Sequence, residues 1–267
     1  MTQTQTKSVP RFATPIVETH CHLDYLDGEQ LQDTLVAATA SGIERIVTIA
    51  VSADNLECVR AIAGTHEQVW CTQGIHPHEA DSWSEEIDLA VKLGCKDAKT
   101  VAIGEIGLDY HYDHADRKAQ ARCFEAQLNL AKELDLPVVV HTRDADEDTR
   151  AILANHSQHL ARKGVIHSFT SSLELAEFCL AEGFLLGFNG IVTFRNADNV
   201  RSVVEATPAA SIVLETDSPY LTPVPFRGRP NAPHYLPLIA EAVAEIKGMD
   251  IEPFLQMARR TSYQLFF

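Results

Sequence analysis

Histidines and carboxylates follow short apolar segments at several points of this 267-residue chain, and these are residue types that bind divalent metal ions. His20 and His22 are separated by one residue after the apolar pair Ile16-Val17, and Glu105 ends the run 101–104 of apolar residues and glycine. Alternate side chains of a strand share a face, so the two imidazoles would point the same way. Imidazole and carboxylate ligands together suit Zn²⁺ or Mn²⁺, and a cation of this kind can activate a water molecule. The pattern therefore predicts a metal site.

Each of these residues also has an ordinary structural interpretation when it is considered alone. Glu105 would need a partner at the end of a buried strand, and an ion pair with Arg or Lys would supply one. A strand-end histidine such as His141 is often a core residue, and Asp217, which precedes Ser218-Pro219, could cap a helix. Metal binding is the better interpretation because so many converging ligand-type groups would be underpaired without a cation. The residues concerned are His20, His22, His76, Glu105, His141, His167 and Asp217.

Eight short apolar segments, separated by helical patterns, are expected to position these side chains. The predicted strands cover residues 16–22, 45–51, 69–74, 101–105, 136–141, 164–167, 184–189 and 211–217. Helical spacing of apolar residues predicts helices over 30–41, 54–64, 116–134 and 172–183, and two more that begin near 235 and 251. This alternation predicts an α/β fold, a (β/α)₈ TIM-like barrel, although a doubly wound open sheet gives a similar pattern. Barrel enzymes build their sites at the C-terminal ends of the strands, where the polar residues lie, so we favour the barrel.

Composition limits the setting of this fold. Residues 1–13 are polar and predict a flexible N-terminal leader without core residues or a targeting signal, followed by a single domain over 14–267. The six cysteines form no CxxC pair, and no apolar run is long enough to span a membrane, so we expect a cytoplasmic protein. The net charge of −15 argues against a general nucleic-acid coat, but a local phosphate site stays possible.

Six motifs around the candidate ligands resemble those of the TatD-type metal-dependent deoxyribonucleases, which are relatives of the amidohydrolase barrels. They lie, in the same order as in that family, at residues 18–24, 74–78, 104–110, 140–143, 166–170 and 215–223. The chain departs from the family pattern in having Glu18 where Asp is usual, Ala232 where Glu is usual, and Ser171-Ser172 where Gly-Ser is frequent. The last two departures leave the loops on the substrate side less defined than the metal ligands.

The resemblance implies two divalent cations, Zn²⁺, Mn²⁺ or Mg²⁺. It assigns His20, His22 and Asp217 to one cation, His141 and His167 to the other, and Glu105 to the bridge between them. Asp217 would also take a proton from the attacking water, while His76, Arg143 and Arg227 would contact phosphate oxygens. The expected activity is a 3′–5′ exonuclease acting on DNA ends, single-stranded or at the 3′ terminus.

Two other functions fit parts of the pattern. An amidohydrolase-type enzyme that cleaves a lactone, amide or phosphotriester would share the barrel, but a lysine at a strand end, the usual carboxylated metal bridge, would be expected. Glu105 occupies the fourth-strand position, and no lysine falls at a strand end. A non-enzymatic, metal-stabilised scaffold would instead need closed ligand shells.

Overall fold

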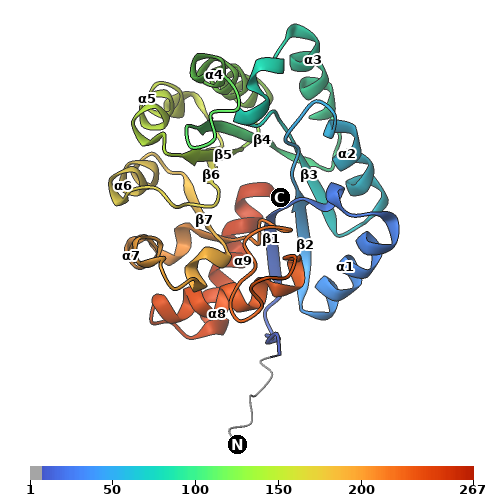
Figure 1. The fold of residues 1–267 in the computed structure, drawn as a ribbon, viewed down its shortest axis with the longest axis vertical. Helices are drawn as coiled ribbons and strands as arrows, with labels where there is room; N and C mark the ends of the chain where they lie inside the picture. The colour runs from blue at the N-terminus through green and yellow to red at the C-terminus, as the bar shows by residue number, and fades with distance from the viewer. Residues whose placement is uncertain (1–7) are drawn as a thin grey trace, which may run out of the picture.

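The computed structural model describes residues 8–267, in which eight parallel strands form one sheet surrounded by helices (Figure 1). The sheet order follows the chain from β1 to β8, and each strand pairs with the next in parallel. The strands are β1 (Ile16–Cys21), β2 (Ile43–Thr48), β3 (Val69–Gln73), β4 (Thr100–Asp109), β5 (Val138–Arg143), β6 (Gly164–Ile166), β7 (Leu185–Phe188) and β8 (Ile212–Leu214). A doubly wound sheet would reverse its strand order, so the predicted TIM-like barrel is confirmed.

Helices on the outside of the barrel follow the strands. They are α1 (Gly28–Ala40), α2 (Leu56–Thr65), α3 (Glu85–Gly94), α4 (Arg117–Leu134), α5 (Asp146–His156), α6 (Leu173–Ala181), α7 (Asp198–Ala206), α8 (Leu236–Ile246) and α9 (Ile251–Phe266). The sequence analysis missed α3, α5 and α7, although they are as long as the predicted helices α2 and α6 and bury a similar number of residues. Within residues 8–267, no helix combines the length and apolar character needed to cross a membrane.

The barrel closes between β8 and β1 at its C-terminal end. The N–H of Asp217 donates to the carbonyl of His20 at 2.9 Å, and the N–H of His22 donates to the carbonyl of Ser218 at 2.8 Å. The Thr19 hydroxyl donates to the carbonyl of Leu214, also at 2.9 Å. This seam brings the segment after the last strand alongside the first strand, although almost two hundred residues separate them.

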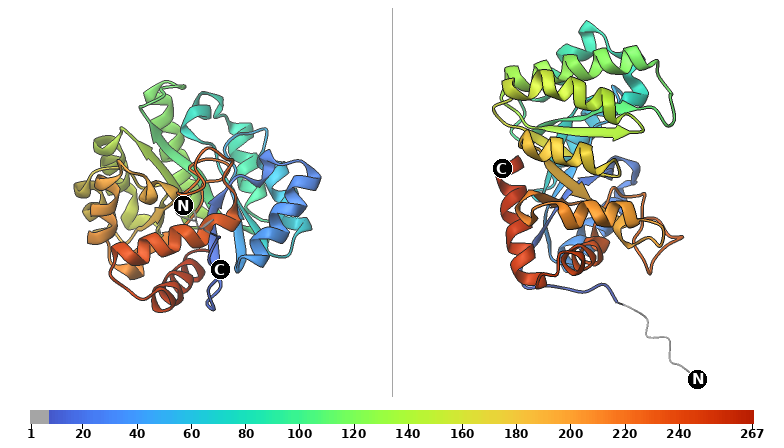
Figure 2. Two further views of the ribbon diagram at one scale, coloured as in Figure 1. Left: turned by 60° about the horizontal axis from the view of Figure 1, so that its bottom comes forward. Right: turned by 90° about the vertical axis from the view of Figure 1, so that its left-hand side faces the viewer.

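The barrel interior is filled by small β-branched residues and is plugged from one end by the C-terminal helix. Val47, Val139 and Val213 form a buried cluster with Leu265 and Phe266 of α9. In the right-hand view of Figure 2, α9 (red) and the loop before α8 (orange) lie on opposite sides of the strands. The plugged end is therefore closed by packing, and the opposite end is free to carry a site.

The start of the described chain is attached to the barrel more firmly than the sequence suggested. Phe12 packs against the main hydrophobic core, and the N–H groups of Ala13 and Thr14 donate to the Glu252 carboxylate at 2.8 and 2.9 Å. The sequence predicts no core residue within 1–13; Phe12 is a partly buried residue that packs against the core, and an isolated aromatic residue in a polar segment carries no periodic signal. The rest of the predicted leader, residues 1–7, lies outside the described residues.

Candidate metal centre

Two histidines and an aspartate from the closing seam face one another at the mouth of the barrel. His20 is fully buried in β1, and His22 follows that strand with 7% of its surface exposed. Oδ1 of Asp217 lies 3.5 Å from Nε2 of His22 and 3.7 Å from Nε2 of His20. The two histidines share a face, as strand geometry requires, and the three residues form a group whose ligand atoms lie within 4.8 Å of one another.

Glu105 of β4 lies among four histidines that come from four other strands or strand ends. Its Oε1 atom is 2.9 Å from Nδ1 of His141, 2.9 Å from Nε2 of His167 and 3.5 Å from Nε2 of His76. Its Oε2 atom faces Nε2 of His20 at 3.4 Å. No Arg or Lys is paired with Glu105 among residues 8–267, so the alternative of a simple buried ion pair is not supported.

Electrostatics keeps this carboxylate ionised. Burial would raise the pKa of Glu105, but the charges of His167, His76 and His20 outweigh burial and hold the pKa well below its usual value. The pKa of His167 moves the other way: burial lowers it, but Glu105 and Glu215 raise it well above its usual value. The pKa of each group in the cluster therefore depends on the charges of its neighbours, and Glu105 and His167 are largely shielded from solvent.

The donor set fits divalent cations. Three groups have the spacing to hold one: His20, His22 and Asp217; His20, Glu105 and His167; and His76, Glu105 and His141. Both ring nitrogens of His20 and Nδ1 of His22 are buried without a hydrogen-bond partner in the described structure. Buried polar atoms are rarely left unpaired, and imidazole nitrogen is a preferred ligand of Zn²⁺ and Mn²⁺. All six predicted ligands therefore meet in one cluster, together with His76, which the sequence assigned to phosphate.

Asp217 does not cap a helix. Within residues 8–267, the strand β8 is followed by a loop up to the short 3₁₀ helix Pro233–Tyr235, and no helix begins at Asp217. Its carboxylate has an exposed fraction of 14% and faces His22. Burial raises the pKa of Asp217, but the hydrogen bond from His22 and the nearby histidines lower it below its usual value.

Asp109 is a functional candidate that sequence reasoning missed. Its Oδ2 atom lies 3.0 Å from Nε2 of His141 and 3.0 Å from Nε2 of His78, so it fixes both rings. Burial would raise the pKa of Asp109, but its hydrogen bonds with His141 and His78 lower it below the usual range. A carboxylate on the far nitrogen of a ligand histidine is a recurrent support of metal sites. The predicted strand ended at residue 105, whereas β4 extends to Asp109, so the sequence analysis left Asp109 outside the strand.

Two buried glutamates, Glu18 and Glu215, accept hydrogen bonds from the segments that carry the candidate ligands. Oε1 of Glu18 accepts hydrogen bonds from the N–H of His20 at 3.1 Å and of Thr216 at 2.9 Å, so it ties β1 to the segment after β8. Oε1 of Glu215 accepts from the N–H of Ser168 and lies 3.5 Å from Nδ1 of His167. Burial raises the pKa of Glu18 to about 8, although its hydrogen bonds to Thr216 and His20 oppose this. The glutamate that departs from the family pattern thus has a defined structural role.

The two predicted phosphate-binding arginines lie in different surroundings. Arg143 ends β5, is partly buried, and its guanidinium carbon lies 4.8 Å from the ring centre of Tyr112. Arg227 is exposed, lies 3.9 Å from the ring centre of Phe194 and donates to the carbonyl of Thr222 at 3.2 Å. Neither makes a salt bridge within residues 8–267, so surface ion pairing does not account for them.

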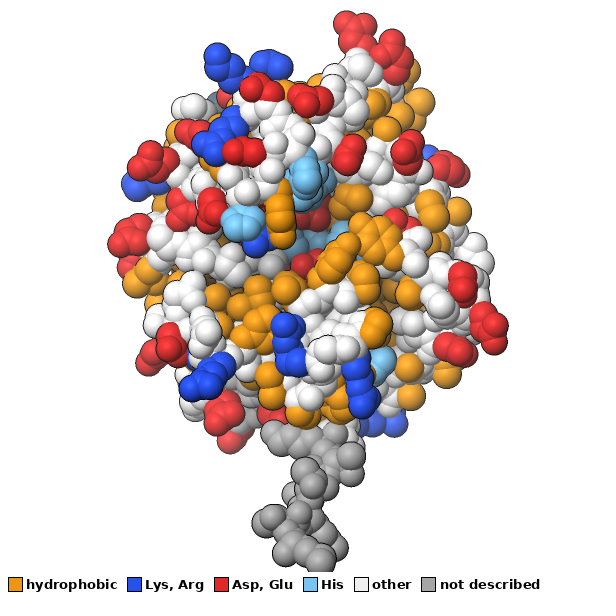
Figure 3. Space-filling view, in the orientation of Figure 1, with side chains coloured by type: hydrophobic (Ala, Val, Ile, Leu, Met, Phe, Trp, Pro, Cys, Tyr) orange, Lys and Arg blue, Asp and Glu red, His pale blue; other side chains and the backbone are white. Residues whose placement is uncertain are grey.

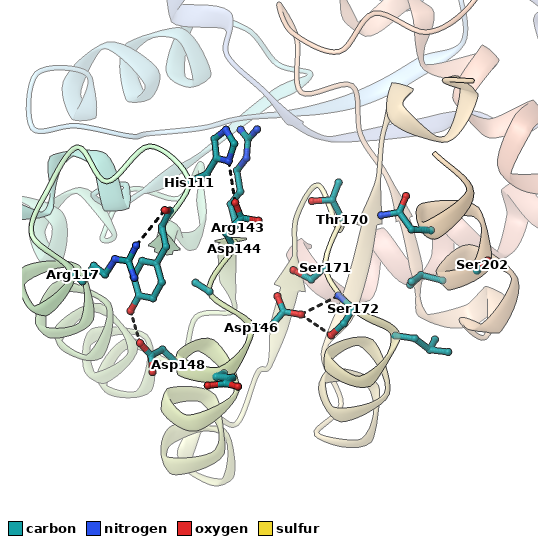
Figure 4. Close-up of a pocket in the computed structure, with 16 residues that line it drawn as sticks. His111, Arg117, Arg143, Asp144, Asp146, Asp148, Thr170, Ser171, Ser172 and Ser202 are labelled. Carbon is teal, nitrogen blue, oxygen red and sulfur yellow. Dashed lines mark hydrogen bonds and ion pairs between the residues drawn. The ribbon is translucent and has the colours of Figure 1, made fainter. Parts of the chain in front are cut away.

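A groove of about 1030 Å³ runs from Arg143 over the N-termini of α5 and α6 (Figure 4). We call it the acidic groove because its lining includes Asp144, Asp146, Glu147 and Asp148. The hydroxyl of Ser172 donates to Asp146 at 2.6 Å, and Ser172 also caps α6, so the serine that this chain shares with the family pattern has a defined structural role. The histidine cluster is not part of this groove; it lies in the hollow that Figure 3 shows, with pale blue histidines between hydrophobic side chains.

Comparison with known proteins agrees with this fold and with a metal-dependent hydrolase. The family model described as TatD related DNase matches residues 17–266. An uncharacterised metal-dependent hydrolase of Bacillus subtilis, YabD, is 37% identical over 94% of this chain and 98% of its own. A protein of Erwinia tasmaniensis named 3′-5′ ssDNA/RNA exonuclease TatD is 35% identical over 86% of this chain and 90% of its own.

A solved structure gives the same result. The crystal structure of YjjV, a TatD homologue from Escherichia coli, superimposes with a TM-score of 0.89 at 31% identity, covering 94% of this chain and 97% of that one. Both the sequence matches and this structure extend over nearly the whole barrel. The chain therefore belongs to the TatD-related DNase family, a family of metal-dependent hydrolases.

Proposed function

We propose that this protein hydrolyses phosphodiester bonds of DNA and removes nucleotides from the 3′ end of a single strand. The donor set at the barrel mouth supports metal-dependent hydrolysis, and the name of the Erwinia relative supports a single-stranded nucleic-acid substrate. The direction of cleavage is inferred from the name of that relative and from the family resemblance.

The observation that carries the proposal is the orientation of Glu105. One of its oxygens faces His20 at 3.4 Å, and the other faces His141 and His167 at 2.9 Å each. A single carboxylate directed at two ligand sets suits a bridge between two cations. In this proposal His20, His22 and Asp217 would hold one cation. His141 and His167 would hold the other together with Glu105, a pairing that follows the family resemblance and is not one of the three groups above.

Two divalent cations held there would lower the pKa of a water molecule and neutralise charge on the attacked phosphate. The side chains then have separate tasks. Oδ1 of Asp217 faces His22, and no hydrogen bond or ion pair within residues 8–267 involves its Oδ2, which leaves that oxygen to accept a proton from the attacking water. Arg143 and His76 lie at the rim of the cluster and would contact phosphate oxygens, Arg143 through two parallel hydrogen bonds, and Arg227 would contact the strand farther out.

Two observations weigh against the other functions. Among residues 8–267, no lysine follows the C-terminal end of a strand, so the carboxylated-lysine bridge of amidohydrolases has no counterpart. The side chains of His76, His141 and Asp217 are 12%, 16% and 14% exposed, which opens the cluster to solvent on one side. A purely structural metal site would be closed.

The direct test is an activity panel on protein stripped with a chelator and reloaded with Mn²⁺, Zn²⁺ or Mg²⁺. Substrates are 3′- and 5′-labelled oligonucleotides, single- and double-stranded, together with a lactone and a phosphotriester. We expect no cleavage without metal, and stepwise shortening from the 3′ end of the single strand after reloading. Full activity of verified metal-free protein would refute the mechanism, and cleavage of the lactone or phosphotriester alone would refute the substrate class.

Glu105→Gln tests the bridge separately, because the amide keeps the size of the side chain but loses its charge. We expect the variant to bind less metal by elemental analysis and to lose activity. A suitable control is Glu125→Gln on α4, which lies outside the cluster. Unchanged metal content in Glu105→Gln would show that the bridge is assigned to the wrong residue.

A further inference from the structure

Two exposed tyrosines stand beside the candidate metal group and have no part in the chemistry proposed above. Tyr25 and Tyr220 are 48% and 53% exposed, and their ring centres lie 6.3 Å apart with the planes at 82°. The Tyr25 ring also stacks on His22, at 5.2 Å and 12° between planes. Aromatic rings therefore continue outward from His22 to solvent. Figure 3 shows hydrophobic side chains at the rim of the hollow.

Both tyrosines are fixed by the same elements that position the ligands. Tyr25 lies three residues after His22, and Tyr220 lies three residues after Asp217. The N–H of Tyr220 donates to the carbonyl of Asp217 at 2.9 Å, and its carbonyl accepts from the buried side chain of Asn231 at 2.6 Å. The two rings are thus held at a set position relative to the reacting centre, which a rigid binding surface requires.

A polyanion could leave the barrel mouth over the acidic groove or over the loop that carries Tyr220, and these two surfaces differ in charge. The acidic groove on one side presents four carboxylates, whereas Arg143 and Arg117 are its only arginines, and Arg117 is engaged by Asp113 at 2.7 Å. On the other side, the loop that carries Tyr220 also carries the exposed Arg227 and Arg229. Beyond Arg143, a chain of phosphates is repelled by the carboxylates of the groove and attracted to this loop, so the strand should pass the tyrosines.

We propose that Tyr25 and Tyr220 form a stacking platform for the nucleobase next to the reacting phosphate, an inference that rests on the proposed function. Aromatic side chains bind the bases of single strands by stacking, which tolerates any sequence because every base has a π-face. The perpendicular rings offer one face and one edge, the two favourable aromatic contacts.

The test is a binding assay that does not depend on turnover. Metal-loaded protein is titrated into a phosphorothioate-linked single-stranded oligonucleotide, which resists hydrolysis and carries fluorescent 2-aminopurine as its 3′-terminal base. We expect wild-type protein to quench the fluorescence, and Tyr25→Ala or Tyr220→Ala to weaken binding by about 5- to 160-fold, the range for loss of one stacked base. Tyr25→Phe and Tyr220→Phe keep the rings and should bind like wild type, as should Leu93→Ala, a remote exposed apolar residue on α3.

A second oligonucleotide with an abasic 3′ terminus identifies what the rings recognise. Wild-type protein should bind it as weakly as the Ala variants bind the parent strand, and the Ala variants should no longer distinguish the two. If wild type hydrolyses DNA but the Ala variants keep the wild-type preference for a base, the platform is wrong and the proposed function stands. If wild type neither binds the strand nor hydrolyses any phosphodiester, both are overturned.

Discussion

The N–H of Asp217 donates a 2.9 Å hydrogen bond to the carbonyl of His20, so the same contact that closes the barrel also positions two candidate ligands. Asp217 adopts a φ of 56°, in the left-handed region that Asp and Asn tolerate better than most residues. This bend turns its carboxylate toward His22, at 3.5 Å. Closure of the barrel and the positioning of this part of the site therefore depend on the same contact.

Asp217→Asn should separate the chemical role of this residue from its structural role. Asn accepts the same backbone conformation, but its amide is a poor metal ligand and takes no proton from water. We expect kcat to fall by at least about 10²-fold, the low end for loss of a general base. The melting temperature of the chelator-treated variant should match that of chelator-treated wild type, because metal-linked stabilisation is then absent from both. Near-normal turnover would remove Asp217 from the mechanism.

Asp109→Asn should loosen the metal site without removing a ligand. The aspartate holds both His141 and His78 at 3.0 Å, and such supporting carboxylates contribute about 10- to 100-fold to metal affinity. We expect metal affinity, measured with a competing chelator, to fall within that range and the pH profile of kcat/KM to shift. Asp113→Asn is the matched control, because Asp113 is exposed and pairs with Arg117. It should leave both the metal affinity and the pH profile of kcat/KM unchanged. A lower melting temperature with normal metal affinity would indicate a purely structural role.

Arg143→Ala should affect long substrates more than short ones. The guanidinium stands at the barrel rim, where it can contact phosphates on either side of the bond that is cut. We expect KM to rise more for oligonucleotides than for bis(4-nitrophenyl) phosphate, which carries one phosphate. The control is Arg150→Ala on α5, an exposed arginine that also lies over an aromatic ring, that of Phe178. Equal effects on both substrates would restrict Arg143 to the reacting phosphate.

Phe12→Ala should destabilise the fold, in contrast to the sequence-based expectation that residues 1–13 form a leader without core residues. The ring is partly buried against the main core, so we expect a loss of about 1–2 kcal/mol, below the range for a fully buried aromatic. Urea unfolding measures this as a lower midpoint at an unchanged slope. Val36→Ala, which truncates a side chain that is 58% exposed, should have almost no effect. An unchanged midpoint for Phe12→Ala would mean that this contact contributes nothing.

The sequence by itself predicted the features of this protein that depend on local periodicity. The alternation of apolar segments with helical patterns predicted the barrel, and the period of two along a strand placed His20 and His22 on one face. Residues at the C-terminal ends of parallel strands must gather at one end of a barrel, so the candidate ligands were found without knowledge of their contacts.

Only the tertiary structure decided which of these groups face one another. Asp109 pairs with His78 and His141, and Glu215 with His167, across segments that are far apart in the chain. The choice between helix capping and the ligand cluster for Asp217 likewise depended on how β8 meets β1. The physical reason is that these pairings follow from strand register, closure and the direction of each side chain at the barrel mouth, and no period within a single segment encodes them.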